Sequence, residues 1–360
     1  MMNILCIADI HFGKIPNEKE MYNALQNNFI EYAKEVKPEL IVICGDSYDC
    51  RVNIESAANN YYNRFINDCV NTGATIIVIE GTEAHDRYQI NGLAHHSSDK
   101  FFIVNTVSEF NLFGLKILVV PEEYVKNDNY YDEYKNKKYD FIFGHGMSSH
   151  VGFSNVNNDE LVRKPYIWDA KQLEKICKYY TVFGHIHTHS EYHKFIYCGS
   201  FSRLNFGEME DKGFIHLQLE NEKCKWKFVK NNNAPLFTDV YESKLSDDVE
   251  KLIIQLRGYQ ENNDFVRFII DQPDENKMNN IKGFVKTHSD NCCIKQSINT
   301  NEKRLIEISE NIKEKQKMLS DRMKEYENMD MIEITQTIAK RDYHTDFTKE
   351  EIFTVLNTQI

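Results

Sequence analysis

Residues 40–49 read L-I-V-I-C-G-D-S-Y-D, an apolar run that ends in Gly45 and Asp46. A short apolar run rich in β-branched residues and bounded by a glycine turn predicts a buried β-strand. The same order, an apolar run followed by Asp or His in a turn, recurs through the N-terminal half of the chain. Longer polar stretches with helical periodicity separate these runs, and this alternation predicts a layered α/β domain.

The expected elements follow from this alternation. We expect strands at residues 4–8, 40–44, 75–79, 116–120, 140–143 and 181–183. We expect helices at residues 18–36, 54–72 and 170–179. From residue 195 onward, short apolar segments are separated by turns, which predicts antiparallel strands that close the domain.

The composition changes at residues 231–235, N-N-N-A-P, which predicts a domain boundary. We expect three parts: a core at residues 1–232, a small α+β module at residues 233–297 and a helical tail at residues 298–360. In the module, a strand-like segment, D-F-V-R-F-I-I-D, lies between predicted helices at residues 246–259 and 275–287. In the tail, an apolar stripe from Leu305 to Met323 predicts a short amphipathic helix.

The composition restricts the class of protein. The 360 residues are 41% hydrophobic and 27% charged, as in soluble globular proteins, and no apolar run reaches the roughly 18 residues that span a membrane. The nine cysteines form no C-x-x-C pair, which favours free thiols in a reducing compartment. The net charge of -12 argues against binding a polyanion over the whole surface, but bound cations and a local basic patch still permit a nucleic-acid enzyme. We expect a soluble, cytoplasmic protein.

Five segments place Asp or His beside a small or turn-forming residue directly after an apolar run. They are D-I-H at residues 9–11, G-D-S-Y-D at 45–49, G-T-E-A-H-D at 81–86, G-H-G at 144–146 and G-H-I-H at 184–187. Ligands of α/β sheets gather outside the carboxyl ends of the strands, so these side chains are expected to converge. Carboxylates and imidazoles together suit manganese, iron and zinc. Because the set exceeds what one ion uses, it predicts two ions that share Asp46, an arrangement suited to phosphoester hydrolysis.

Read in order, the five segments resemble the calcineurin-like metallophosphoesterases, whose signature is D-x-H, G-D-x-x-D, G-N-H-D/E, G-H and G-H-x-H. Within that superfamily, D-I-H-F-G at residues 9–13, G-H-I-H-T-H at 184–189 and Y-C-G-S-F-S-R at 197–203 are similar to the SbcD-type DNA nucleases of bacteria and phages. The resemblance implies a four-layer α/β-β/α sandwich, with a small α+β capping module that positions DNA and a C-terminal helical segment.

The resemblance also implies a role for individual residues. It implies one ion bound by Asp9, His11, Asp46 and His187, and a second bound by Asp46, His145 and His185. It implies that His85 is the catalytic histidine that contacts the scissile phosphate and the leaving group, and that Asp86 orients it. We expect Arg203 to contact the substrate backbone.

The third segment departs from the family pattern. Three residues instead of one separate Gly81 from His85, and the asparagine that completes the second ion's ligands in the family is missing. Glu83 is the first candidate to replace it, because a carboxylate is a hard oxygen donor. Thr82, a backbone carbonyl and water are the alternatives.

The activity implied by the resemblance is a manganese-dependent exonuclease on duplex DNA and endonuclease on single strands, with iron and zinc as alternative metals. The implied assembly is a homodimer that binds an SbcC-like coiled-coil ATPase through the tail, in a DNA repair and recombination complex of a bacterial or phage-infected cell. Two other functions stay open: a metallophosphatase or nucleotide phosphodiesterase with the same core, and a non-catalytic DNA-binding subunit.

Overall fold

The computed structural model describes residues 1–14, 18–87, 89–96, 99–123, 131–149, 166–258, 265–271, 275–288 and 292–296. Contacts along the chain divide it into two units, Met1–Lys295 and Gln296–Ile360. The helical tail expected at residues 298–360 lies outside the described residues. Within the described ranges, no helix is both long and apolar enough to cross a membrane.

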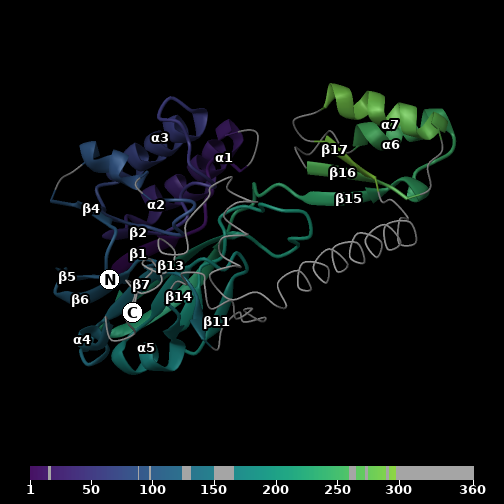
Figure 1. The fold of residues 1–360 in the computed structure, drawn as a ribbon. Helices are drawn as coiled ribbons and strands as arrows, with labels where there is room; N and C mark the ends of the chain where they lie inside the picture. Colours follow the sequence, from purple (N-terminus) through teal and green to yellow (C-terminus); the bar gives the residue numbers. More distant parts are fainter. Residues whose placement is uncertain are drawn as a thin grey trace, which may run out of the picture. The chain divides into compact units, whose positions relative to one another are not determined.

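The first sheet, most of whose strands are labelled in Figure 1, has six strands in the order β14-β13-β1-β2-β3-β4. Four strands run parallel: β1 (Met2–Ile7), β2 (Leu40–Cys44), β3 (Thr75–Ile79) and β4 (Phe101–Val104). Two antiparallel strands, β13 (Gly213–Glu220) and β14 (Lys223–Lys230), extend the sheet from β1. β2 and β3 have the predicted bounds, because all their side chains are buried and the apolar runs are unbroken.

The second sheet also has six strands, in the order β11-β12-β10-β7-β6-β5. They are β5 (Ser108–Leu112), β6 (Leu115–Val120), β7 (Phe141–His145), β10 (Thr181–Gly184), β11 (Ser190–Tyr192) and β12 (Phe195–Tyr197). The antiparallel strands expected after residue 195 are confirmed for β13 and β14. β12 differs in part, because it pairs in parallel with β10 as well as antiparallel with β11. The chain reverses twice between these strands, since β11 runs antiparallel to β12.

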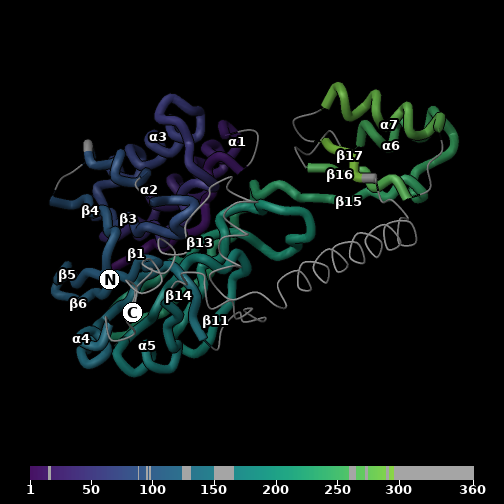
Figure 2. The backbone as a smooth tube through the Cα atoms, viewed as in Figure 1, coloured from purple at the N-terminus to yellow at the C-terminus, as the bar shows by residue number. Residues whose placement is uncertain are grey.

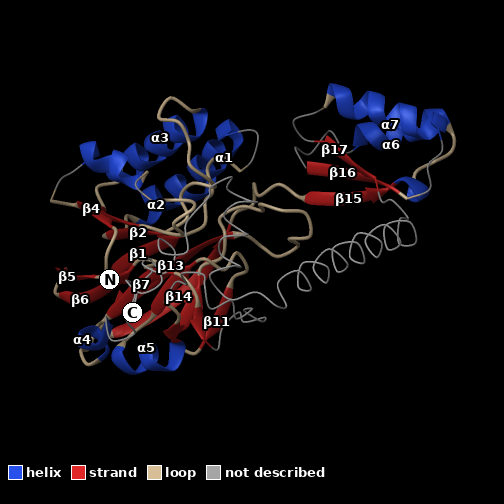
Figure 3. Ribbon diagram, viewed as in Figure 1, coloured by secondary structure: helices blue, strands red, loops and turns tan. Residues whose placement is uncertain are grey.

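Helices cover the outer face of each sheet (Figure 3). On the first sheet lie α1 (Glu18–Ala24), the π-helical segment η1 (Leu25–Ile30), α2 (Glu31–Val36) and α3 (Ala57–Asn71), and on the second lies α5 (Ala170–Ile176). The Ser56 side chain caps α3 by accepting a hydrogen bond from the Asn59 amide, so the helix begins at Ala57 and not at residue 54. The shorter elements are η2 (Ile90–His96), α4 (Asp132–Lys135), β8 (Ser148–Ser149) and β9 (Trp168–Asp169).

Alternation along the strands produces the layers. Leu5 and Ile43 pack against the helices of the first sheet, whereas Cys6 and Val42 pack against the second sheet. On the far side of the second sheet, Leu118 packs in the same cluster as α5. The four-layer α/β-β/α sandwich is therefore confirmed.

The residues after β14 form a small α+β module, which Figure 2 traces from the end of β14. Its three strands are β15 (Phe237–Tyr241), β16 (Phe265–Ile270) and β17 (Cys292–Gln296), in that order in the sheet. Its helices are η4 (Glu242–Lys244), α6 (Val249–Gly258) and α7 (Glu275–Thr287). Leu252, Val266, Phe268 and Ile281 form a separate buried cluster between these elements.

A buried histidine in the first sheet provides a test of the fold. On β13, His216 accepts a hydrogen bond from the Tyr32 hydroxyl at 2.7 Å and donates one to the Asn3 side-chain oxygen at 3.0 Å. The neutral ring satisfies both bonds. Burial, together with the charge of Lys227, lowers the pKa of His216 to about 4.

The stability that His216 contributes is therefore full above its unfolded pKa of about 6.5 and is lost as the pH falls toward 4. The variant His216→Gln keeps a donor and an acceptor but cannot ionise. We expect its free energy of unfolding to change by about 2 kcal/mol less between pH 6.5 and 4 than that of the wild type. Urea denaturation at a series of pH values measures this, and parallel pH profiles for the two proteins would contradict it.

Candidate dimetal centre

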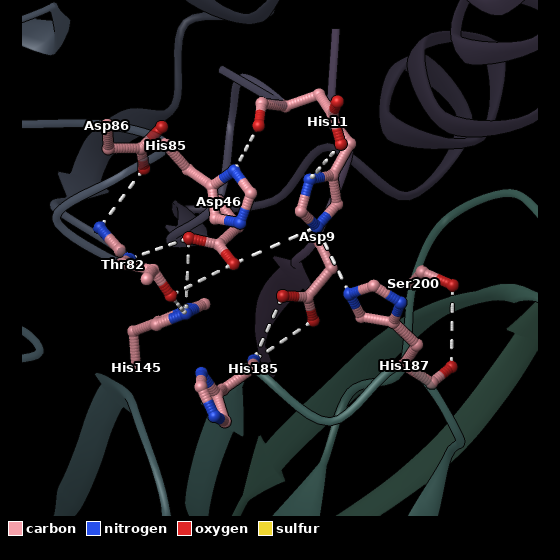
Figure 4. Close-up of polar contacts among 12 residues, drawn as sticks. Asp9, His11, Asp46, Thr82, His85, Asp86, His145, His185, His187 and Ser200 are labelled. Atoms are coloured by element: carbon pink, nitrogen blue, oxygen red, sulfur yellow. Dashed lines mark hydrogen bonds and ion pairs between the residues drawn. The ribbon is translucent and has the colours of Figure 1, made fainter. Parts of the chain in front are cut away.

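The carboxyl ends of parallel strands from both sheets carry the predicted ligands. Asp9 and His11 follow β1, and Asp46 follows β2 in the first sheet. His145 ends β7, while His185 and His187 follow β10 in the second sheet. Figure 4 shows these side chains pointing toward one another.

The turns after the strands adopt an uncommon backbone conformation. Asp9, His11, Asp46 and His185 have φ angles of 50°, 53°, 49° and 94°. Residues other than glycine seldom occupy this left-handed region, and such strain gathers at functional sites. Two backbone bonds couple the first two turns: the Asp9 amide donates to the Gly45 carbonyl and the His11 amide to the Asp46 carbonyl, both at 3.1 Å.

The first ligand group consists of Asp9, His11 and His187, whose ligand atoms lie within 4.8 Å of one another. The Nε2 atoms of His11 and His187 are 3.1 Å apart. Two imidazole nitrogens that bind one ion at about 2.1 Å and at a right angle lie about 3 Å apart, so this spacing fits a shared cation. The Asp9 carboxylate is anchored by the His185 amide at 2.9 and 3.1 Å.

The second ligand group consists of Asp46, His145 and His185, again within 4.8 Å. His145 Nδ1 donates to the Cys44 carbonyl at 2.8 Å, which leaves its Nε2 as a lone-pair donor for a metal ion. This Nε2 lies 3.3 Å from Asp46 Oδ1, and Asp46 Oδ2 lies 3.8 Å from His11 Nε2. One carboxylate oxygen thus faces each group, as a bridging ligand requires.

The charge state of Asp46 suits this position. Burial alone would raise the pKa of its carboxyl, but His145, His11 and His85 together lower the pKa well below its usual range. The Thr82 amide also donates to Asp46 Oδ1 at 2.6 Å. The candidate bridging group is therefore a carboxylate that already accepts a hydrogen bond from the backbone.

His85 lies beside the first group, with its ring centroid 4.8 Å from that of His11 (Figure 4). Its Nδ1 donates to the Asp49 carbonyl oxygen, so its Nε2 is the nitrogen available to a substrate. The expectation that Asp86 orients His85 needs correction, because the Asp49 carbonyl oxygen, and not the Asp86 carboxylate, accepts the hydrogen bond from His85 Nδ1.

Asp86 instead joins two loops. Its buried carboxylate accepts hydrogen bonds from the amides of Gly81 at 3.0 Å, Tyr48 at 3.1 Å and Ser47 at 3.2 Å. Burial and the charge of Asp46 raise the pKa of Asp86 to about 7, against the opposite effect of the three amides. Asp86 therefore fixes the loop that carries His85 without contacting the imidazole ring.

Two predicted residues lie outside the ligand groups. The Glu83 carboxylate pairs with Arg87, four residues further on, and 36% of the Glu83 side chain is exposed. The buried Arg203 guanidinium donates to the carbonyl oxygens of Glu208, Ala234 and Glu210 at 3.0 to 3.1 Å. Arg203 thus binds the backbone of its own chain in place of a substrate.

Glu122 is a buried acid at the second group that sequence reasoning missed. Its Oε2 lies 3.1 Å from His185 Nδ1 and 3.9 Å from His145 Nε2, and the Thr82 hydroxyl donates to it at 3.4 Å. Burial would raise the pKa of Glu122, but His185 and His145 lower it. The signal that could have found it is V-V-P-E at residues 119–122, another apolar run followed by an acid.

Glu208 is a second missed acid, beside the first group. Its Oε1 lies 3.9 Å from His187 Nδ1, and its Oε2 pairs with buried Lys212 at 2.8 Å. Burial would raise its pKa, but His187, Lys212 and Asn205 lower it to about 2. The carboxylate therefore lies behind the ring of a candidate metal ligand. No strand end precedes Glu208, so the sequence pattern gave no signal.

The fold and the donor set are those of a metallophosphoesterase. The model of the calcineurin-like phosphoesterase family matches residues 2–189, and the chain belongs to this family. A search of curated proteins found no match to the chain.

Solved structures that match the chain include a dimetal phosphatase from Danio rerio, at 10% identity and a TM-score of 0.43, over 64% of this chain and 96% of that one. Another is a protein of unknown function from Aquifex aeolicus, at 13% identity and a TM-score of 0.22, over 43% of this chain and 81% of that one.

The bridging position of Asp46 gives a testable prediction. We expect Asp46→Ala to weaken the binding of both ions together, because each group loses one carboxylate oxygen. Metal analysis after dialysis against Mn²⁺ measures the ions retained, with Glu83→Ala as a control that changes an acid outside both groups. A variant that still holds one ion at wild-type affinity would exclude the bridge.

Proposed function

We propose that this chain is a metal-dependent DNA nuclease that hydrolyses phosphodiester bonds. One observation carries the proposal: Asp46 lies between a group of one Asp and two His residues and a pair of His residues, and His85 lies beside them with one ring nitrogen available. Family membership gives the wider class, metal-dependent hydrolysis of phosphoesters.

The residues of the site have different proposed roles, in metal binding and in proton transfer. Asp9, His11, Asp46 and His187 would hold one ion, and Asp46, His145 and His185 the other. Ions bound there supply Lewis-acid polarisation of a phosphoryl group and activation of water. The protein's own groups must then place the scissile phosphate and supply a proton.

His85 is suited to the proton transfer. Hydrolysis breaks the bond between phosphorus and the leaving oxygen, and that oxygen must take up a proton. Protonated His85 gives this proton from Nε2 and returns to the neutral tautomer. The Asp49 carbonyl oxygen stabilises that tautomer, because it accepts a hydrogen bond from Nδ1–H.

DNA is the proposed substrate for two reasons. Residues 9–13, 184–189 and 197–203 are similar to SbcD-type nucleases, and an α+β module follows the core. The proposal includes manganese as the ion, duplex exonuclease and single-strand endonuclease activity, and a homodimer. It also includes an SbcC-like ATPase that binds residues 298–360, in the cytoplasm of a bacterial or phage-infected cell.

Substrate comparison tests the nuclease proposal. We expect the purified chain with Mn²⁺ to cleave duplex and single-stranded DNA with a higher kcat/KM than bis(p-nitrophenyl) phosphate or p-nitrophenyl phosphate. Hydrolysis of the small esters without DNA cleavage would establish a small-substrate phosphatase or phosphodiesterase instead.

His85→Ala tests the catalytic proposal. We expect the variant to keep both metal ions and to lose DNA cleavage by about 100-fold or more, as removal of a general acid does. The control is His193→Asn, which changes an exposed histidine in the turn between β11 and β12. Metal content and initial cleavage rates are measured on the same samples. A rate for His85→Ala close to that of the control would refute the role.

A further inference from the structure

We propose that Glu122 is a ligand of the second metal ion and takes the place of the asparagine that is missing from G-T-E-A-H-D. This inference rests on the proposed dimetal centre and adds a seventh ligand residue to it. The ligand set would then contain three carboxylates, from Asp9, Asp46 and Glu122.

The position of the carboxylate carries the inference. Glu122 Oε2 lies 3.9 Å from His145 Nε2, and this is the ring nitrogen that faces the centre, because Nδ1 is bonded to the Cys44 carbonyl. The same oxygen lies 3.1 Å from His185 Nδ1. Two nitrogen ligands of one ion and a third oxygen ligand are expected at separations of about 3 to 4 Å.

Burial distinguishes Glu122 from the candidate chosen on sequence. Only 2% of the Glu122 side chain is exposed, against 36% for Glu83. Carboxylates are seldom buried to this extent unless they pair with a cation or coordinate a metal. Glu83 already pairs with Arg87 at the surface, whereas Glu122 lies among histidines.

Two backbone features lie next to Glu122. Pro121 follows the last residue of β6 and has no backbone N–H to donate to a neighbouring strand, so the strand ends just before Glu122. Gly146, next to His145, has a φ of 128°, and a Cβ atom there would lie 3.6 Å from Glu122 Cγ. At that distance a Cβ atom would make ordinary van der Waals contact, so the positive φ, and not the space taken by Glu122, accounts for the glycine.

Thr82 shows why a new ligand is needed. It occupies the position after Gly81, where the family has asparagine. Its hydroxyl lies 3.3 Å from Asp46 Oδ2 and 3.4 Å from both Glu122 Oε2 and His145 Nε2. The shorter side chain therefore borders the second group, and Glu122 approaches the same group from the opposite sheet.

Titration with Mn²⁺ tests the assignment. Wild type, Glu122→Ala and Glu83→Ala are compared by calorimetry, and folding is checked by circular dichroism without metal. We expect two ions bound by wild type and by Glu83→Ala. We expect Glu122→Ala to bind the first ion with unchanged affinity and the second at least about 10-fold more weakly.

A second variant separates a ligand from a residue that only orients His185. Thr82→Asn, combined with Glu122→Ala, supplies an amide oxygen at the vacated position. We expect this double variant to recover the affinity for the second ion, because a lost ligand is replaced. A positioning role would leave the loss uncorrected, since asparagine at residue 82 does not restore a partner for His185 Nδ1.

The outcomes distinguish this inference from the proposed function. Two ions bound to Glu122→Ala with wild-type affinity, or no recovery in the double variant, would overturn the assignment of Glu122 and leave the dimetal centre standing. A wild-type chain that takes up one Mn²⁺ ion or none would overturn the centre, and the assignment of Glu122 with it.

Discussion

The buried carboxylate of Asp46 is the group around which the two sheets are organised. A buried charge is costly unless other groups pair with it, and here each supporting group comes from a different strand. Thr82, after β3, donates its amide, and His145, at the end of β7, brings an imidazole from the other sheet. Gly81 permits this approach, because a Cβ atom at that position would collide with the Asp46 backbone and carboxylate. The order of the strands therefore determines which groups stabilise the buried charge of Asp46.

The fold was predictable where burial is complete along a strand. Strands β2 and β3 are unbroken apolar runs because neighbouring layers cover both faces, and their bounds follow directly from the sequence. β4 and β5 escaped prediction because half-buried side chains weaken the pattern. The direction of β12 depends on two successive reversals of the chain, and local sequence does not encode which strand becomes its neighbour.

The candidate site also has residues that the sequence predicted and residues that it did not. Asp and His residues that follow strands can be predicted from their position after an apolar run, and the structure brings six of them into two groups. The place of Glu122 in the site could not be predicted, because it depends on contacts between residues far apart in the sequence. The orientation of His85 could not be predicted either, because it depends on the backbone oxygen of Asp49. Glu83 was the natural candidate by distance along the chain. The tight turn at residues 83–87 instead brings it beside Arg87, four residues further on, and an ion pair forms there.

The left-handed turns also limit how the centre can change in evolution. In the proposed dimetal centre, a residue at position 9, 11, 46 or 185 must coordinate a metal and also tolerate a positive φ. Few amino acids meet both conditions: aspartate, asparagine and histidine tolerate this backbone and offer a ligand atom, whereas glutamate offers a ligand atom but gains no local support for the backbone. Thr82 and Glu122 are not among the residues with positive φ. Ligand replacement is therefore expected at such positions, where side-chain identity can drift without remodelling the turn.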